Sequence, residues 1–229
     1  MSPRASAPTR TAKRRAGRPR VPAGSREALL AAGTALFAEH GFDGVSVSAI
    51  AQKAGVNRAM ISYHFGGKRD LYLAILAATF GEIVADVERI ADSPRPAREA
   101  LRGVLATIGD TATRRHPHFC TMMLREALTG EARLETATLV PLLRVMAAVQ
   151  RIVERGSREG VFRPVDPLLT HLSLVGSLVF FFATGRFRQR LLRDQLHREP
   201  PDGAAYIAHL QDLMIEGLLA SRGTARARS

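Results

Sequence analysis

Residues 46–65 read SVSAIAQKAGVNRAMISYHF, and this stretch decides the fold. It predicts two helices of about seven residues, which are too short to be stable alone and must pack on each other and on a third helix. Ala51 is small where the second helix has to approach, and Gly55, four residues later, offers the positive φ that a tight turn needs. Four apolar residues have the spacing that fills the space between the helices: Ile50, Ala54, Val56 and Ile61. The pattern is typical of a helix-turn-helix.

In a helix-turn-helix, the second helix lies in the major groove of DNA with its first residues facing the base edges. Arg58 can pair with guanine through two hydrogen bonds, and Ala59 or Met60 can contact a thymine methyl group. Lys68 begins the next helix after two glycines, where its ammonium group and the helix N-terminus can both meet a phosphate. The DNA-binding set expected in this segment is Ser46, Asn57, Arg58, Ala59, Met60, Ser62, Tyr63, His64 and Lys68.

Positive charge is concentrated at the start of the chain. The protein of 229 residues has a net charge of +12, and residues 1–70 hold twelve Lys and Arg but four acids, a net of +8. This asymmetry is typical of a protein with a polyanionic partner, and a solvated basic tail is the alternative. Together with the Ala51–Gly55 spacing and the helix that starts at Lys68 after two glycines, it favours DNA binding over a three-helix bundle with no role in DNA binding. Residues 1–24 have no hydrophobic periodicity and predict a disordered basic arm.

The arm contains RRAGRPR at residues 14–20, similar to the Gly-Arg-Pro core of AT-hook segments. The narrow minor groove of A·T-rich DNA attracts inserted arginines, so Arg15, Arg18 and Arg20 are candidate minor-groove contacts. The alternative is a basic tail that only keeps the protein solvated. A membrane-surface role is less favoured because no amphipathic helix with a basic face accompanies the arm.

The rest of the chain has helical periodicity, and no segment alternates as a strand does, so the predicted fold is all-α. Nine helices are expected, with approximate bounds 25–40, 46–53, 57–64, 68–90, 97–114, 117–129, 134–159, 166–192 and 203–221. The predicted division is a basic arm (1–24), a three-helix DNA-binding domain (25–70), a helical effector-binding and dimerisation domain (71–221) and a frayed tail (222–229).

Residues 26–72 resemble the N-terminal domain of TetR/AcrR-type regulators. The resemblance rests on ALLAAGTALFAEHGF at 28–42, SVSAIAQKAGV at 46–56 and YHFGGKRDLY at 63–72. It implies an all-α homodimer that binds a double-stranded DNA operator and is released by a small molecule. Ser62 departs from the family pattern, which usually has tyrosine there, whereas Tyr63 keeps the next position.

The second half of the chain has to supply dimerisation and any sensing. The helix expected at 166–192 is apolar on nearly all faces, and the last helix, at 203–221, has apolar residues at i, i+3, i+4 and i+7. We expect these two helices from each protomer to form a four-helix interface. Residues 117–130 (PHFCTMMLREALTG) and 159–167 (EGVFRPVDP) also resemble one subgroup of the family, the CecR-like regulators.

An apolar effector pocket is expected in the same domain because methionine and phenylalanine suit adaptable ligand sites. The candidate ligand-binding residues are Phe119, Met122, Met123, Arg125, Met146 and Phe181, with ordinary core packing as the alternative for each. The side chains of His116, His118, Cys120 and His171 are of types that bind metals, but their spacing matches no metal-binding pattern. No metal or cofactor is expected.

Other functional classes have little support. The single cysteine allows no intramolecular disulfide, and the longest apolar stretch, residues 172–183, is shorter than the ~18–20 residues that span a bilayer, so a cytoplasmic protein without membrane association is expected. No catalytic motif is present, so an enzyme is not expected. The predicted function is a ligand-responsive regulator, more often a repressor in this family, that binds a pseudo-palindromic operator as a dimer. The alternative is an architectural DNA-binding protein without an effector.

Overall fold

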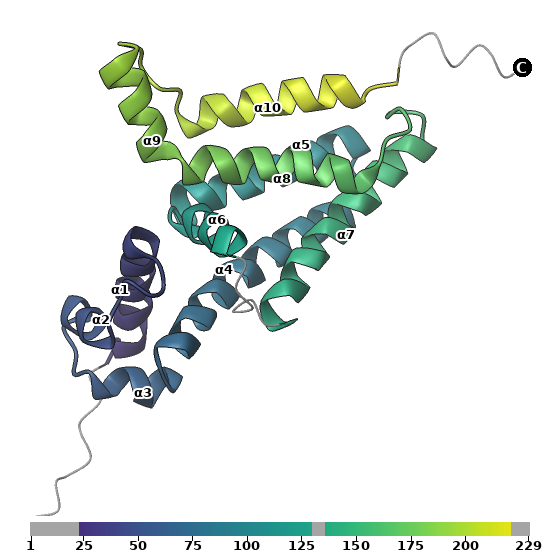
Figure 1. Ribbon diagram of the computed structural model, residues 1–229. Helices are drawn as coiled ribbons and strands as arrows, with labels where there is room; N and C mark the ends of the chain where they lie inside the picture. The colour runs from purple at the N-terminus through teal and green to yellow at the C-terminus, as the bar shows by residue number, and fades with distance from the viewer. Residues whose placement is uncertain (1–22, 130–135, 221–229) are drawn as a thin grey trace, which may run out of the picture.

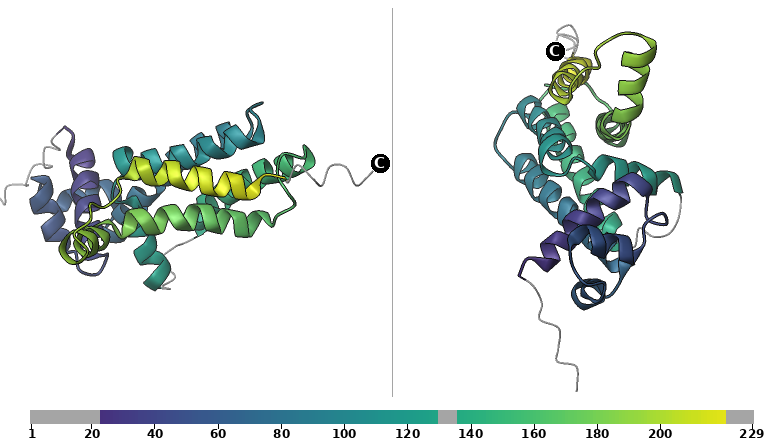
Figure 2. Two further views of the ribbon diagram at one scale, coloured as in Figure 1. Left: turned by 90° about the horizontal axis from the view of Figure 1, so that it is seen from above. Right: turned by 90° about the vertical axis from the view of Figure 1, so that its left-hand side faces the viewer.

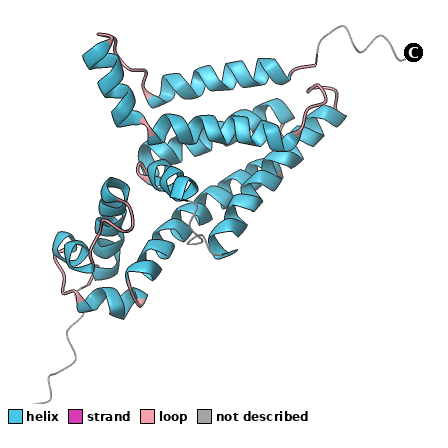
Figure 3. Ribbon diagram, in the orientation of Figure 1, coloured by secondary structure: helices cyan, strands magenta, loops and turns pink. Residues whose placement is uncertain are grey.

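The computed structural model describes residues 23–129 and 136–220, and within these ranges the chain is helical without a β-strand (Figure 3). In the described ranges, ten α-helices and two short π-helical segments, η1 and η2, follow one another. The all-α prediction is confirmed. The predicted arm up to residue 22 and the tail at 222–229 lie outside the described residues.

Three short helices form the N-terminal domain: α1 (Ser25–His40), α2 (Val47–Ala54) and α3 (Ala59–Phe65). α1 begins and ends where the sequence predicts. It stops at Gly41, whose φ of 73° is in the region that favours glycine and whose N–H donates to the carbonyl of Phe37. The side chains that hold the three helices together are almost fully buried, among them Leu29, Phe37, Ile50 and Ile61.

The long helix α4 (Lys68–Ala91) connects the two halves of the protein (Figure 1). Its 24 residues extend for about 36 Å. The first half buries Leu71 and Leu76 in the core of the N-terminal domain, whereas the second half buries Ile83 and Val87 in the core of the C-terminal domain. The predicted boundary at residue 70 therefore falls at the start of a helix that belongs to both cores.

The C-terminal domain is a helical bundle in which α8 and α10 lie side by side along one flank (Figures 1 and 2). Its elements are α5 (Ala97–Asp110), η1 (Thr111–Arg115), α6 (Phe119–Thr129), α7 (Thr136–Arg158), α8 (Pro167–Ala183), α9 (Gly185–Gln189), η2 (Arg190–Gln195) and α10 (Gly203–Leu218). Their largest fully buried side chains include Leu101, Leu105, Ile152, Phe162 and Leu174.

The prediction of one helix over 166–192 is wrong, since the chain bends by 66° between α8 and the α9–η2 segment. Three stacked side chains hold the bend. The guanidinium of Arg188 lies 3.5 Å from the centroid of the Phe181 ring, and that ring stacks at 3.7 Å on Tyr206 of α10. No proline in the sequence marks this break. Because of it, the described part of the chain has ten α-helices where nine were expected.

Among the described helices, none is individually long and apolar enough to cross a membrane. α8 together with α9 and η2 reaches that length and composition only as a bent pair.

Candidate DNA-binding surface and effector cavity

Local hydrogen bonds fix the turn between α2 and α3. The hydroxyl of Ser46 caps α2 by accepting from the backbone N–H of Ala49 at 3.0 Å. Gly55 follows α2 with a φ of 67°, and the N–H of Val56 donates back to the carbonyl of Ala51. With Ile50 and Ile61 fully buried below it, the turn holds α3 at a set angle to α2, as the sequence predicts.

The outer face of α3 is polar and exposed. The side chain of Asn57 accepts a 2.8 Å hydrogen bond from the N–H of Ala59 and so starts the helix. Arg58, Ser62 and Tyr63 point to solvent, and the Tyr63 side chain is 58% exposed. These residues, with Ala59, are the predicted DNA-binding residues that the structure brings together on an open face.

Three other members of the predicted DNA-binding set are engaged inside the domain. Met60 is 4% exposed and packs in the three-helix core, so it leaves the set of base contacts. His64 lies with its Nε2 atom 2.7 Å from the hydroxyl of Ser25, which ties α3 to the start of α1. The ammonium of Lys68 donates to the carbonyls of Phe42 and Val45, both at 2.9 Å.

Periodicity alone did not reveal these internal roles. Met60 is one residue from Ile61 and shares its buried side of a short helix, while the partner of His64 is 39 residues away in the sequence. Arg15, Arg18 and Arg20 of the arm lie outside the described residues.

A small apolar cavity lies inside the C-terminal domain. Its volume is about 60 Å³, and helices α4 to α8 all contribute to its wall. The lining residues are Phe80, Ile83, Ile108, Phe119, Cys120, Met123, Leu142, Val145, His171, Val175 and Val179. Spaces between the helices of a bundle are a common location for a small-molecule ligand, and at this volume the wall would have to move apart to admit one.

Of the six residues predicted to bind a ligand, Phe119 and Met123 line the cavity. Three of the others pack elsewhere: Met122 belongs to the core of the N-terminal domain, Met146 is half-buried on α7 outside the lining, and Phe181 is covered by Tyr206 and Arg188. Arg125 is exposed and donates to the carbonyl of Glu39 at 3.1 Å, so it contacts α1 rather than a ligand.

The polar groups of the cavity are those that the sequence raised only as metal candidates. The Nδ1 atom of His171 is buried without a hydrogen-bond partner, and burial lowers the pKa of this imidazole. The spacing of His171, Val175 and Val179 by four residues on α8 is the sequence signal that places them on one face. In the described ranges, no group of three His, Cys, Asp or Glu residues is arranged to hold a metal ion.

Cys120 offers a direct test of how closed the cavity is. Burial raises the pKa of its thiol to about 12, so at pH 8 the reactive thiolate is rarer by roughly a thousandfold than for an ordinary cysteine. We expect iodoacetamide to label the folded protein very slowly and the protein unfolded in guanidinium chloride quickly, at the single cysteine of the chain. Fast labelling of the folded protein would contradict a closed cavity.

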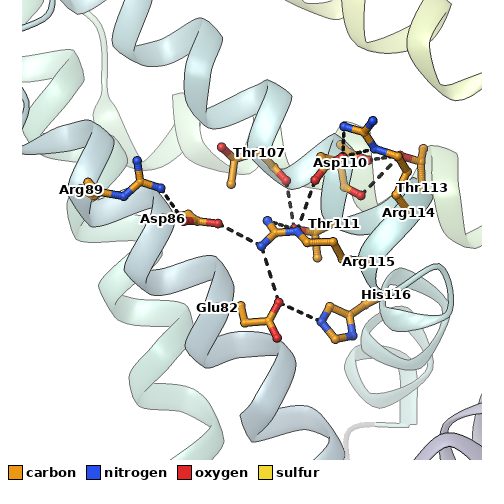
Figure 4. A network of polar contacts seen from close by, with 11 residues as sticks. Glu82, Asp86, Arg89, Thr107, Asp110, Thr111, Thr113, Arg114, Arg115 and His116 are labelled. Carbon is orange, nitrogen blue, oxygen red and sulfur yellow. Dashed lines mark hydrogen bonds and ion pairs between the residues drawn. The ribbon is translucent and has the colours of Figure 1, made fainter.

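A polar network connects η1, which lies just before α6, to α4 (Figure 4). Arg115 is its centre: the guanidinium donates to Asp86 at 3.0 Å and to the hydroxyl of Thr111 at 2.8 Å, and it pairs with Asp110 at 3.3 Å. Hydrogen bonds from Arg89 and Arg115 lower the pKa of the Asp86 carboxyl. The network sets the position at which α6 leaves the bundle.

Helix α6 contacts both the cavity and the DNA-binding domain. Phe119 packs against both hydrophobic cores and meets Phe80 of α4 edge to face, with ring centroids 4.9 Å apart. One turn further along, Met122 is buried beneath the N-terminal domain, and Arg125 bonds to the end of α1. One short helix therefore contacts both the cavity and α1.

An apolar face on α8 and α10 has no cover within the described chain. Leu169, Leu172 and Phe180 on α8 are 62%, 56% and 63% exposed, and Leu213 on α10 is 60% exposed. A surface groove of about 470 Å³ runs between the two helices beside Leu169 and Leu213. Exposed apolar side chains that gather on neighbouring helices are typical of a protein interface.

Comparison with known proteins agrees with this arrangement. The profile described as "Bacterial regulatory proteins, tetR family" matches residues 29–75, and the one described as "Tetracyclin repressor-like, C-terminal domain" matches residues 96–214. The chain is 30% identical over 200 residues to the HTH-type transcriptional repressor NicS of Pseudomonas putida, covering 85% of this chain and 92% of that protein.

Two further relatives show how far the likeness extends. The HTH-type transcriptional dual regulator CecR of Shigella flexneri is 35% identical over 88 residues, which is 35% of this chain and 39% of CecR. The ketosteroid transcriptional regulator KstR2 of Mycobacterium tuberculosis shares the fold with a TM-score of 0.68 at 21% identity, covering 86% of this chain and 95% of that one. The chain belongs to the TetR family of DNA-binding transcriptional regulators, which are not enzymes.

Proposed function

We propose that this regulator acts as a repressor: a homodimer binds a pseudo-palindromic operator, and a small molecule in the cavity releases it. The observation that carries the proposal is the exposed polar face of α3, held by a buried three-helix core beside an internal cavity. NicS, similar over nearly its whole length, is itself described as a repressor. A function in DNA regulation also implies that the protein works in the cytoplasm.

The proposed operator contacts divide by role. Arg58 at the start of α3 is suited to a guanine, since a guanidinium pairs with the two acceptors of that base in the major groove. Ser62 and Tyr63 lie further along the same exposed face and are suited to phosphates. Arg15, Arg18 and Arg20 of the arm are proposed to enter the adjacent minor groove, where narrow A·T-rich segments attract arginine.

The proposed dimer forms through the uncovered face of α8 and α10. Leu172, Gly176 and Phe180 are spaced by four residues and so share one side of α8. A methyl group added at Gly176 or at Gly217 of α10 would have no neighbour within 4 Å, so a partner helix has room to approach. Pairing both helices with their copies would make a four-helix interface of two-fold symmetry.

The proposed mechanism couples the cavity to the spacing of the two α3 helices. A dimer reads two successive major grooves only when these helices are about 34–36 Å apart. A ligand that pushes Phe119 moves α6, and α6 is bonded to α1 through Arg125. The ligand-bound state then holds the reading helices at another spacing and loses operator affinity, because the ligand favours that state.

The CecR-like assignment of the C-terminal domain also remains a proposal. The assignment rests on the sequences of residues 117–130 and 159–167. The alignment with CecR itself extends over 88 residues, which is only 35% of this chain. The NicS alignment supports a relationship over 85% of this chain.

Operator recognition is tested with the DNA that flanks the protein's own gene. We expect saturable binding that survives excess competitor DNA, and we expect Arg58→Ala to lose about 1–3 kcal/mol of binding free energy per half-site together with discrimination at the contacted base pair. Fluorescence anisotropy of a labelled duplex measures both effects.

The matched control is Arg158→Ala, which removes the same charge from an exposed site on α7 and should bind like the wild type. Binding that competitor abolishes, with Arg58→Ala equal to the wild type, would contradict operator recognition and point to the architectural function instead.

A further inference from the structure

The cavity in the C-terminal domain is lined almost entirely by apolar side chains. Nine of its eleven lining residues are hydrocarbon side chains or methionine, and the other two are Cys120 and His171. The Nδ1 atom of His171 is buried and makes no hydrogen bond in the described structure. Because buried polar atoms are normally satisfied, an orphaned nitrogen on a residue that lines a cavity points to a hydrogen-bonding group supplied by a ligand.

The charge of the ligand follows from what the wall lacks. None of the lining residues is Lys, Arg, Asp or Glu. Burial lowers the pKa of His171 and raises the pKa of Cys120 to about 12, so both side chains are neutral at pH 7. A carboxylate or phosphate in this cavity would be desolvated without a counter-charge, which is strongly unfavourable. The wall therefore favours an uncharged ligand.

The size of the cavity limits the ligand to about one ring. Its volume is about 60 Å³, less than half of the ~150 Å³ of an engineered cavity that binds benzene. The wall must yield for any ring to enter, and Met123 is the side chain best able to do so because it is long, unbranched and only half-buried. Larger molecules would require the helices themselves to separate.

We infer that the effector is a neutral aromatic alcohol of one ring, with the ring in the apolar cavity and its hydroxyl group hydrogen-bonded to His171 Nδ1. A hydroxyl group can donate to a bare nitrogen or accept from an N–H, so it suits either neutral form of the imidazole. This inference rests on the proposed effector role of the cavity and names the chemical class of its ligand.

The test uses three probes that share a ring and differ in one group: phenol, toluene and benzoate. Isothermal titration calorimetry of the full chain, without DNA, is expected to give phenol about tenfold tighter binding than toluene, and benzoate the weakest binding. In His171→Leu, the preference for phenol over toluene should disappear while toluene still binds. His118→Leu, an exposed histidine just before α6, is the matched control and should behave as the wild type.

A second variant distinguishes the loss of a hydrogen bond from misfolding of the protein. His171→Gln keeps a side chain that can donate and accept, so part of the phenol preference should return, and circular dichroism checks that both variants are folded. In the wild type, phenol should also shift the ¹⁵N resonances of the His171 ring, which a merely structural histidine would not show.

Three results would overturn the inference. Equal affinity for phenol and toluene would remove His171 from ligand binding, and tighter binding of benzoate with proton uptake would assign an anionic ligand. Failure of all three probes to bind at about 10 mM would exclude a single-ring ligand. Because these measurements need no DNA, each result is separate from the operator test with Arg58→Ala.

Discussion

Replacing Leu172 and Leu213 together by glutamate is expected to convert the protein to a monomer and to lower operator affinity by about a hundredfold or more. Both side chains are more than half exposed, on α8 and α10, so the substitutions leave the core of the protomer unchanged. In the proposed dimer they would bring four carboxylates into an apolar interface, where unpaired charges are strongly unfavourable. A monomer holds one reading helix and loses the gain in affinity from binding both half-sites at once.

Sedimentation velocity gives the oligomeric state, and anisotropy with a duplex that contains both half-sites gives the affinity. The matched control is Leu128→Glu, which introduces the same charge at a leucine of α6 that is 77% exposed and lies off the α8–α10 face. We expect this variant to remain a dimer with wild-type affinity. A dimeric Leu172→Glu/Leu213→Glu protein would show that the subunits associate through another surface.

The DNA-binding domain could be predicted closely because its signals are local. The cap at Ser46, the turn at Gly55 and the apolar spacing of Ile50 and Ile61 each determine the backbone within a few residues. The side-chain roles of His64 and Lys68 could not be predicted in the same way. Their partners, Ser25 and the 42–45 loop, come close only through tertiary packing. The local sequence is therefore the same whether these side chains face DNA or bond inside the domain.

The cavity was the hardest feature to predict because five helices build it. Phe119 and Met123 are predicted from their residue types and do line the cavity, but Met146, predicted on the same ground, lies outside the lining. Periodicity shows that a side chain faces inward without showing whether it meets another side chain or a void. The residue type of His171 suggests only a metal ligand. That its Nδ1 atom has no hydrogen-bond partner depends on the side chains packed around it, which the sequence does not show.

The break at Thr184 could not be predicted for a related reason. Apolar residues at helical spacing continue beyond it with Phe187 and Leu191, and nothing from Thr184 to Arg190 is a proline. The bend depends on Arg188 stacking on Phe181, and on Phe181 stacking in turn on Tyr206 of α10, which lies 25 positions further along the chain. Local propensity permits a straight helix there, and tertiary contacts decide otherwise.

Replacing Lys68 by alanine is expected to lower the free energy of unfolding by about 2–4 kcal/mol, a large effect for one side chain. Its ammonium donates to the carbonyls of Phe42 and Val45 and lies 4.2 Å from the centroid of the Phe42 ring. Alanine would leave two carbonyls of the α1–α2 loop without this donor and free the loop that leads into the cap of α2. Urea unfolding, followed by circular dichroism, measures the loss.

The dependence of operator binding on salt separates this internal role from a phosphate contact. If Lys68 only paired with a phosphate, Lys68→Ala would keep its stability and lower the slope of log affinity against log salt by about one per protomer. We expect the reverse, a large loss of stability with a slope close to that of the wild type, because two carbonyls already hold the ammonium. Lys53→Ala, which removes an exposed charge from α2, is the matched control and should leave the free energy of unfolding unchanged. A stable Lys68→Ala protein with a lower slope would therefore return this lysine to the DNA-binding set.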